Sequence, residues 1–292
     1  MRPSIRRLLR SGTAAEVAKP FLKWAGGKTA LLPELLKAAP EQIETYYEPF
    51  LGGGALFFAL QAEGRFKRAV LSDSNEELIN AYIQARDNLD ALVRALRVHQ
   101  RKYRDAEDRA DYYYTIRSKS LTCDLGGAAN LIFLNKTCFN GLYRVNSKGR
   151  FNVPHGRYKN PTICDEPNLR AVSHALQGVE LQIADFAAAP SAARKGDFIY
   201  FDPPYVPLSE TAYFTSYTAN DFSMEEQKRL ARTALKLACQ QSSVALSNSG
   251  HPDVVAMYSS EAFQLDEVHV RRAINSDASG RGPVREYLIQ SV

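Results

Sequence analysis

Asp-Phe-Ile-Tyr-Phe-Asp-Pro-Pro-Tyr, residues 197–205, is the stretch that decides the fold of this chain. The apolar run 198–201 has the length and the aromatic and β-branched content of a buried strand. The run ends at Asp202, and the two prolines that follow cannot continue a strand or a helix. We therefore expect Asp202 and Tyr205 to lie at the end of a strand, where open α/β sheets bind ligands. A turn that carries a surface tyrosine is the alternative that this stretch alone leaves open.

Other short apolar runs alternate with helical patterns along the chain. Strands are expected around residue 46 and at the runs 69–71, 181–183, 244–247, 264–270 and 285–289. Capping boxes at Ser74 with Glu77 and at Ser223 with Glu226 predict the starts of two helices. Strands that alternate with helices predict a doubly wound α/β sheet. The block 76–172, whose first part has a helical period, interrupts this alternation and is predicted to be an insertion after the second strand.

The charge of the chain is concentrated in its N-terminal tail. The formal net charge is +5, and residues 1–20 hold one acid, Glu16, against the basic residues Arg2, Arg6, Arg7, Arg10 and Lys19. We predict a basic, flexible arm at 1–18, one α/β domain made of 19–75 and 173–292, and the inserted domain at 76–172.

Several classes of protein are excluded by composition. No apolar run approaches the ~18 residues of a membrane span, and no continuous apolar core precedes Lys19, as a secretory signal would require. The four cysteines form no Cys-x-x-Cys pair and have no helpful histidine spacing. We expect reduced thiols, no metal site, no membrane partner and a cytoplasmic protein.

A glycine turn and an acid form a second constellation. The segment from Glu48 to Gly54, Glu-Pro-Phe-Leu-Gly-Gly-Gly, follows an expected strand and precedes a helix. Glycine lets a ligand approach the backbone closely, at the partly positive helix N-terminus. Asp73 stands at the end of the next expected strand, 21 residues after Gly52. An acid at that distance is placed to accept from both hydroxyls of a ribose, so a cofactor that contains a nucleoside is predicted.

The segment 20–28, Pro-Phe-Leu-Lys-Trp-Ala-Gly-Gly-Lys, is a glycine-rich turn that presents Trp24 and Lys28 beside a helix start. It is no phosphate-binding loop, because Leu22 stands where that motif requires glycine. A packed tryptophan with a solvent lysine is the structural alternative.

Residues 125–164 contain no acid, and basic residues alternate there with aromatic ones. The runs 142–146 and 150–154, joined across Ser147-Lys148-Gly149, predict a β-hairpin. A basic hairpin with polar side chains is suited to nucleic acid, with lysines for phosphates and amides or a guanidinium for base edges. A hairpin that is merely solvated is the alternative.

Taken together, these segments resemble the DNA adenine methyltransferases of the Dam type, over nearly the whole chain from about Lys19 to Leu288. The similarity also includes Asn-Gly-Leu-Tyr-Arg at 140–144, Gly-Arg-Phe-Asn-Val-Pro at 149–154, Val-Pro-Leu-Ser after the Asp-Pro-Pro-Tyr motif, Phe-Thr-Ser-Tyr ending at Tyr217, and Val-Arg-Arg-Ala-Ile from Val270. The resemblance implies a methyltransferase (Rossmann-like) version of the doubly wound sheet, with its last strand antiparallel. It further implies S-adenosylmethionine as cofactor, a mostly helical DNA-recognition domain at 76–172 that carries the hairpin, and a monomer that methylates adenine in duplex DNA by base flipping, with GATC as the favoured target.

The same resemblance implies roles for individual residues. The catalytic motif would be formed by Asp202, Pro203, Pro204 and Tyr205. The cofactor would be contacted by Trp24, Lys28, Glu48, Phe50, Gly52, Gly54, Asp73, Asp185, Phe186 and Asp202. The DNA would be contacted by Lys23, Asn140, Leu142, Arg144, Pro154 and Tyr158.

In the mechanism that this family implies, the Asp202 carboxylate and the Pro203 carbonyl accept the two N–H bonds of the target amine. Its lone pair then points at the sulfonium methyl, and Tyr205 stacks on the base. The nearest rival is a methyltransferase that acts on the cytosine amine, although such enzymes more often carry serine where Asp202 stands. Relatives that modify glutamine carry asparagine there. A DNA-binding protein that has lost catalysis is the alternative from another class, and the intact Asp202, Tyr205, Asp73 and Lys28 argue against it.

Overall fold

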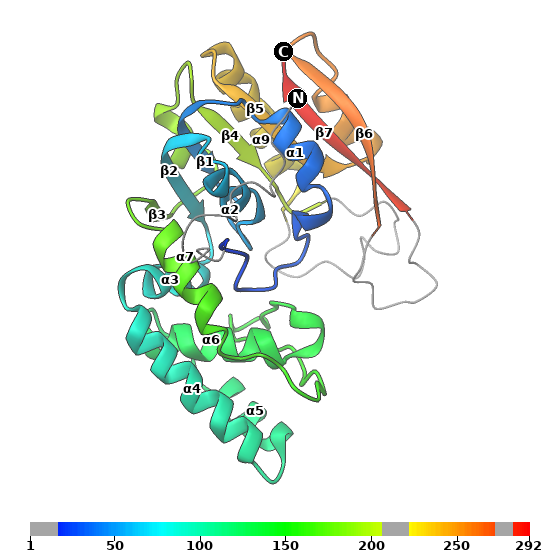
Figure 1. The fold of residues 1–292 in the computed structure, drawn as a ribbon. Helices are drawn as coiled ribbons and strands as arrows, with labels where there is room; N and C mark the ends of the chain where they lie inside the picture. Colours follow the sequence, from blue (N-terminus) through cyan, green and yellow to red (C-terminus); the bar gives the residue numbers. More distant parts are fainter. Residues whose placement is uncertain (1–16, 206–221, 272–282) are drawn as a thin grey trace.

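The computed structural model describes residues 17–205, 222–271 and 283–292, and its centre is one seven-stranded sheet (Figure 1). The strands are β1 (Ile43–Glu48), β2 (Phe66–Asp73), β3 (Glu180–Ile183), β4 (Phe198–Phe201), β5 (Ser243–Ser249), β6 (Phe263–Arg271) and β7 (Pro283–Ser291). Their order across the sheet is β3-β2-β1-β4-β5-β7-β6. Strands β1 to β5 run parallel, and β7 runs antiparallel between β5 and β6. The predicted doubly wound sheet with an antiparallel last strand is therefore confirmed.

Strand β4 shows why the sheet is buried on both faces. All four of its residues are buried, and alternate side chains belong to different apolar clusters. Phe198 and Tyr200 join the cluster that includes side chains of α1 (Leu32–Ala38) and α2 (Ala55–Ala62). Ile199 and Phe201 join the cluster that includes side chains of α9 (Met224–Cys239) and α10 (Pro252–Met257). Helices thus cover both faces, as the period-two alternation of a strand requires.

Five helices lie between β2 and β3 in the sequence: α3 (Glu76–Asp87), α4 (Leu89–Asp105), α5 (Arg109–Arg117), α6 (Leu125–Thr137) and α7 (Glu166–Ala175). In Figure 1, α4, α5 and α6 lie at one end of the molecule, away from β6 and β7. The buried residues of these helices, such as Leu131 and Phe133, belong to the same apolar cluster as one face of the sheet. A recognition domain at 76–172 stays a prediction.

The predicted hairpin forms, with irregular geometry. Asn146 N–H donates to the Arg150 carbonyl and Asn152 N–H to the Arg144 carbonyl, both at 2.9 Å. Val145 and Phe151 form an isolated bridge, and Gly149 has φ +71°, which suits the turn. A short 3-10 turn, η3 (Phe139–Gly141), follows α6 and precedes the hairpin.

One predicted helix start is wrong and one is confirmed. The N-cap of α3 is Asn75, whose side chain accepts from Leu78 N–H at 2.9 Å, and not Ser74. The Glu77 carboxylate accepts from the Tyr143 hydroxyl at 2.7 Å. Ser223 caps α9 as expected, accepting from Glu226 N–H.

Some predictions fall on residues outside the described ranges. These are most of the arm at 1–18, the Val-Pro-Leu-Ser and Phe-Thr-Ser-Tyr segments, and residues 272–274 of the Val-Arg-Arg-Ala-Ile segment.

Candidate active site

The predicted acids meet at one edge of the sheet because parallel strands end there together. Strand β1 lies between β2 and β4, so Glu48, Asp73 and Asp202 stand at or just beyond three neighbouring carboxyl ends. The chain order reverses between β1 and β4, which is the kind of switch point where open α/β sheets bind ligands. The fold alone therefore brings these three carboxyl groups to one place.

Asp202 forms an ion pair with Lys28. The lysine Nζ lies 2.7 Å from Oδ1 of Asp202, with side-chain exposures of 7% and 20%. The same Nζ donates to the Gly26 carbonyl at 2.7 Å and lies 4.7 Å from the ring centre of Tyr205. Burial raises the pKa of Asp202, while the charge of Lys28 opposes that rise. The alternative of a solvent lysine at position 28 is wrong, since this lysine is buried.

The residues after Asp202 are held by side chains from other elements. Gln227 of α9 donates its Nε2 to the Pro204 carbonyl at 3.1 Å. The Tyr205 hydroxyl donates to the carboxylate of Glu286 on β7 at 3.1 Å. Pro203 is buried and Pro204 is exposed. Sequence reasoning missed Gln227 and Glu286; the one signal for Gln227 is a polar residue in the buried stripe of α9, whose other members include Leu230.

The glycine turn is tied to the end of β2. Gly52 and Gly54 have φ +47° and +65°, and a Cβ on Gly52 would lie 2.9 Å from Cδ1 of Trp24. One Asp73 oxygen accepts from Gly52 N–H at 3.2 Å and the other from Asn75 N–H at 3.0 Å. Burial raises the pKa of Asp73. Each carboxylate oxygen has a second lone pair, so Asp73 can still accept from a ligand.

Glu48 is a buried carboxyl at the end of β1. It is 3% exposed and accepts from the Tyr46 hydroxyl at 2.9 Å. Burial raises the pKa of Glu48 to about 8, and the nearby Asp202 adds to the rise. At neutral pH this group therefore holds its proton in most molecules.

Phe50 follows Glu48 and lies in a group of aromatic rings. Its ring stacks on Phe186 with centroids 5.4 Å apart. Asp185, however, is engaged by Arg229 through two hydrogen bonds of 2.7 Å. That guanidinium also lies 4.0 Å from the ring centre of Phe186 and lowers the pKa of Asp185. Phe186 therefore packs on Phe50, as the predicted cofactor site requires, whereas the Asp185 carboxylate is paired with Arg229.

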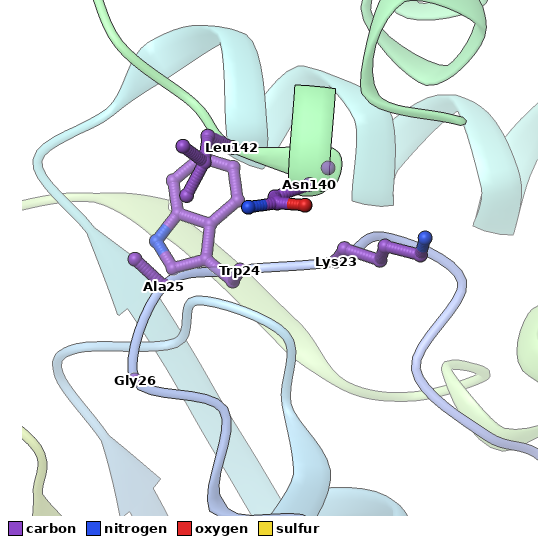
Figure 2. Close-up of a pocket in the computed structure, with 7 residues that line it drawn as sticks. Lys23, Trp24, Ala25, Gly26, Asn140 and Leu142 are labelled. Atoms are coloured by element: carbon purple, nitrogen blue, oxygen red, sulfur yellow. The ribbon is translucent and has the colours of Figure 1, made fainter. Parts of the chain in front are cut away.

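A pocket of about 130 Å³ lies between the segment around Trp24 and the η3 turn (Figure 2). Its lining combines predicted cofactor and DNA residues with their neighbours: Lys23, Trp24, Ala25, Gly26, Asn140, Gly141 and Leu142. Figure 2 shows Leu142 and Asn140 beside the Trp24 ring, whereas the Lys23 side chain points away from it. Trp24 stacks on Tyr143 with centroids 5.0 Å apart.

A buried amide joins the two sides of this pocket. Asn135 of α6, 1% exposed, accepts from Lys23 N–H and donates to the Lys23 carbonyl, both at 2.8 Å. It also donates to the Gly141 carbonyl at 3.1 Å. Asn140 in the same turn has φ +55°. No sequence signal beyond its position in a buried helix marks Asn135.

The remaining predicted DNA residues divide into two groups. The Lys23 Nζ lies 5.1 Å from the ring centre of Tyr158, and the Pro154 carbonyl accepts from Phe139 N–H at 2.8 Å. These residues therefore adjoin the η3 turn. Arg144 lies farther along the hairpin, is exposed, and donates to the side chain of Asn152 at 2.7 Å. The structure does not bring Arg144 to the pocket.

Within residues 17–205, 222–271 and 283–292, no group of three or more His, Cys, Asp or Glu side chains could hold a metal ion. None of the helices in these ranges has the length and apolar content to cross a membrane.

Comparison with known proteins identifies relatives that span nearly the whole chain. The type II methyltransferase M1.LlaDCHI of Lactococcus lactis subsp. cremoris is 41% identical, covering 93% of this chain and 94% of that protein. The type II methyltransferase M.MjaIII of Methanocaldococcus jannaschii is 42% identical, covering 90% and 95%. The DNA adenine methylase of Salmonella typhi is 35% identical, covering 92% and 94%.

The family model described as D12 class N6 adenine-specific DNA methyltransferase matches residues 24–274, which include every predicted site residue except Lys23. This match supports an adenine-specific enzyme over the cytosine-directed and the non-catalytic alternatives. The chain belongs to the D12 class of N6 adenine-specific DNA methyltransferases.

Proposed function

We propose that this enzyme transfers the methyl group to the exocyclic amine of an adenine that is flipped out of duplex DNA, within the sequence GATC. The observation that carries the proposal is the ion pair between the buried Lys28 and the partly exposed Asp202, beside Tyr205 at the carboxyl edge of the sheet. The GATC target rests on the resemblance of the hairpin segments to Dam-type enzymes.

Membership of the family implies S-adenosylmethionine as the methyl donor. The residues present fit this group in one specific respect. The backbone at Gly52 packs so closely on Trp24 that a Cβ would meet the ring at 2.9 Å, so this turn requires glycine, and Asp73 stands at the end of the next strand. We propose that this turn and Asp73 hold the nucleoside of the cofactor, which supplies the activated methyl group. Phe50 and Phe186 would pack beside its base, with Asp185 kept in place by Arg229.

Methyl transfer requires the protein to activate a poor nucleophile. The lone pair of the adenine amine is delocalised into the ring, so the nitrogen must become pyramidal before it attacks. We propose that the Asp202 carboxylate and the Pro203 carbonyl accept its two N–H bonds. Acceptors fixed in advance stabilise the positive charge that develops on the nitrogen. Lys28 must then release Asp202, at least in part, as the amine arrives.

Base flipping costs a few kcal/mol, and the protein must offset it. We propose that Asn140 and Leu142 enter the duplex beside the extruded base, because both line the pocket next to Trp24. Lys23, beside Tyr158, would contact DNA from the catalytic side, and the exposed Arg144 would reach a base edge.

The direct test is to incubate the purified enzyme with labelled S-adenosylmethionine and unmethylated DNA, digest the product and map the modified bases. We expect N6-methyladenine, confined to GATC. The matched control is Asp202→Ala, which should abolish methyl transfer while cofactor binding survives in weakened form. Full activity of that variant would contradict the mechanism, and methylation of adenine at another site would contradict only the target sequence.

A further inference from the structure

A chain of hydrogen bonds leads from strand β5 to the Asp-Pro-Pro-Tyr motif. Ser249 N–H donates to Oδ1 of Asn248 at 2.8 Å, and Nδ2 of Asn248 donates to Oε1 of Gln227 at 3.0 Å. Nε2 of Gln227 then donates to the Pro204 carbonyl at 3.1 Å. Both amide side chains are fully buried, with 0% exposure. Buried amides of this kind are costly unless they are paired, and here their pairing leads to the motif.

The two ends of this chain fix the direction of every bond in it. A backbone N–H can only donate and a carbonyl can only accept. Ser249 therefore sets which side of the Asn248 amide faces β5, and the Pro204 carbonyl sets which side of Gln227 faces the motif. A flip of either amide would place two donors or two acceptors face to face.

We propose that Gln227 is a positioning residue for methyl transfer, which acts by holding the Pro204 carbonyl and thereby aiming the Pro203 carbonyl and the Tyr205 ring at the target base. This inference rests on the proposed function, in which Pro203 accepts one N–H bond of the amine. The prolines at 203 and 204 have no N–H, so neither of them can donate to a neighbouring strand. The Pro204 carbonyl can still accept, and Gln227 of α9 donates to it in place of the N–H of a neighbouring strand. Asn248 holds Gln227 in the required orientation.

The strongest test uses Gln227→Glu, because its ability to donate depends on pH. An ionised glutamate accepts only, whereas a protonated one can donate its O–H to the Pro204 carbonyl. Burial favours the protonated form, so the change falls within an accessible pH range. The single-turnover methylation rate is measured with saturating S-adenosylmethionine on DNA free of N6-methyladenine. We expect the ratio of the variant's rate to the wild-type rate to rise as pH falls. A ratio that does not change with pH would overturn the inference.

A second variant, Gln227→Met, keeps the size of the side chain and removes the donor. Misplacement of reacting groups on the scale of 1 Å lowers rates by up to about 100-fold, so we expect a rate loss of about 10- to 100-fold with cofactor and DNA binding changed less than about threefold. The matched control is Asn80→Leu, which removes another buried amide, one that donates to the Asp124 carbonyl and not to the motif. That variant should lose thermal stability and keep its rate.

The outcomes separate this inference from the proposed function. An unchanged rate in Gln227→Met, or equal rate losses in Gln227→Met and Asn80→Leu, would overturn the positioning role while wild-type methylation of adenine stands. Absence of N6-methyladenine after incubation with the wild-type enzyme would overturn both.

Discussion

The buried carboxyl of Glu48 predicts a pH dependence of stability that a single substitution should remove. The pKa of this group is about 8 in the folded protein, against an ordinary 4.5. The folded state therefore keeps a proton that the unfolded chain releases as pH rises above 4.5. The contribution of this proton to the free energy of unfolding is fully present below pH 4.5, and it is lost progressively as pH rises toward 8. At 1.36 kcal/mol for each pH unit, the loss between pH 5 and pH 8 is about 3 kcal/mol.

Glu48→Gln cannot ionise, and its side-chain carbonyl can still accept from the Tyr46 hydroxyl. We expect the free energy of unfolding of this variant, minus that of the wild type, to rise by about 3 kcal/mol from pH 5 to pH 8. Urea denaturation at several pH values measures this difference. The control is Glu44→Gln on the same strand, where an exposed carboxylate pairs with Lys67 and its pKa is lowered, so no such rise is expected. A difference for Glu48→Gln that stays flat over this range would refute the reasoning.

Three further predictions concern activity. Burial raises the pKa of Asp202, and protonation would remove the negative charge that stabilises the positive charge on the attacking amine. The single-turnover rate should therefore fall as pH drops through a value above the ordinary 3.8; a rate that is constant down to acid unfolding would contradict this. Gly52→Ala places a Cβ 2.9 Å from Trp24 at φ +47°, so cofactor affinity measured by calorimetry should fall, with a loss of about 1–3 kcal/mol in stability. Arg144→Ala should relax discrimination at one base pair by about 1–3 kcal/mol, measured on duplexes with single substitutions; an equal loss on all sequences would make Arg144 a phosphate contact.

The strands could be predicted because their signals are local. The buried run of β4 alternates between two apolar clusters, and the prolines after it mark its end. Once a parallel sheet is assumed, the position of each strand end brings Asp73 and Asp202 to the same edge. The geometry of the sheet therefore follows from short stretches of sequence and one rule about parallel strands.

The partners of the site's side chains could not be predicted, because they come from distant elements. Ser74 and Asn75 are both good helix caps, and in the structure Asn75 is the N-cap of α3. The Glu77 side chain is hydrogen-bonded to Tyr143, a residue of the predicted hairpin. Asp185 likewise is taken by Arg229 of α9. In each case a long-range contact competes with a local motif, and a local pattern carries no information about that contact.

The charges at the carboxyl edge of the sheet explain how a site for a cation can be buried. Asp202 is paired with the charge of Lys28, Asp73 accepts hydrogen bonds from two backbone N–H groups, and Glu48 holds its own proton at neutral pH. These groups can remain buried together because Asp202 has a charge partner, Asp73 has hydrogen-bond donors and Glu48 has a proton. The positive charge of a sulfonium brought to this edge would favour the ionised form of Glu48. It would also weaken the attraction between Lys28 and the Asp202 carboxylate. Both groups would then be carboxylates: Glu48 would balance the positive charge of the cofactor, and Asp202 would be released to accept from the adenine amine.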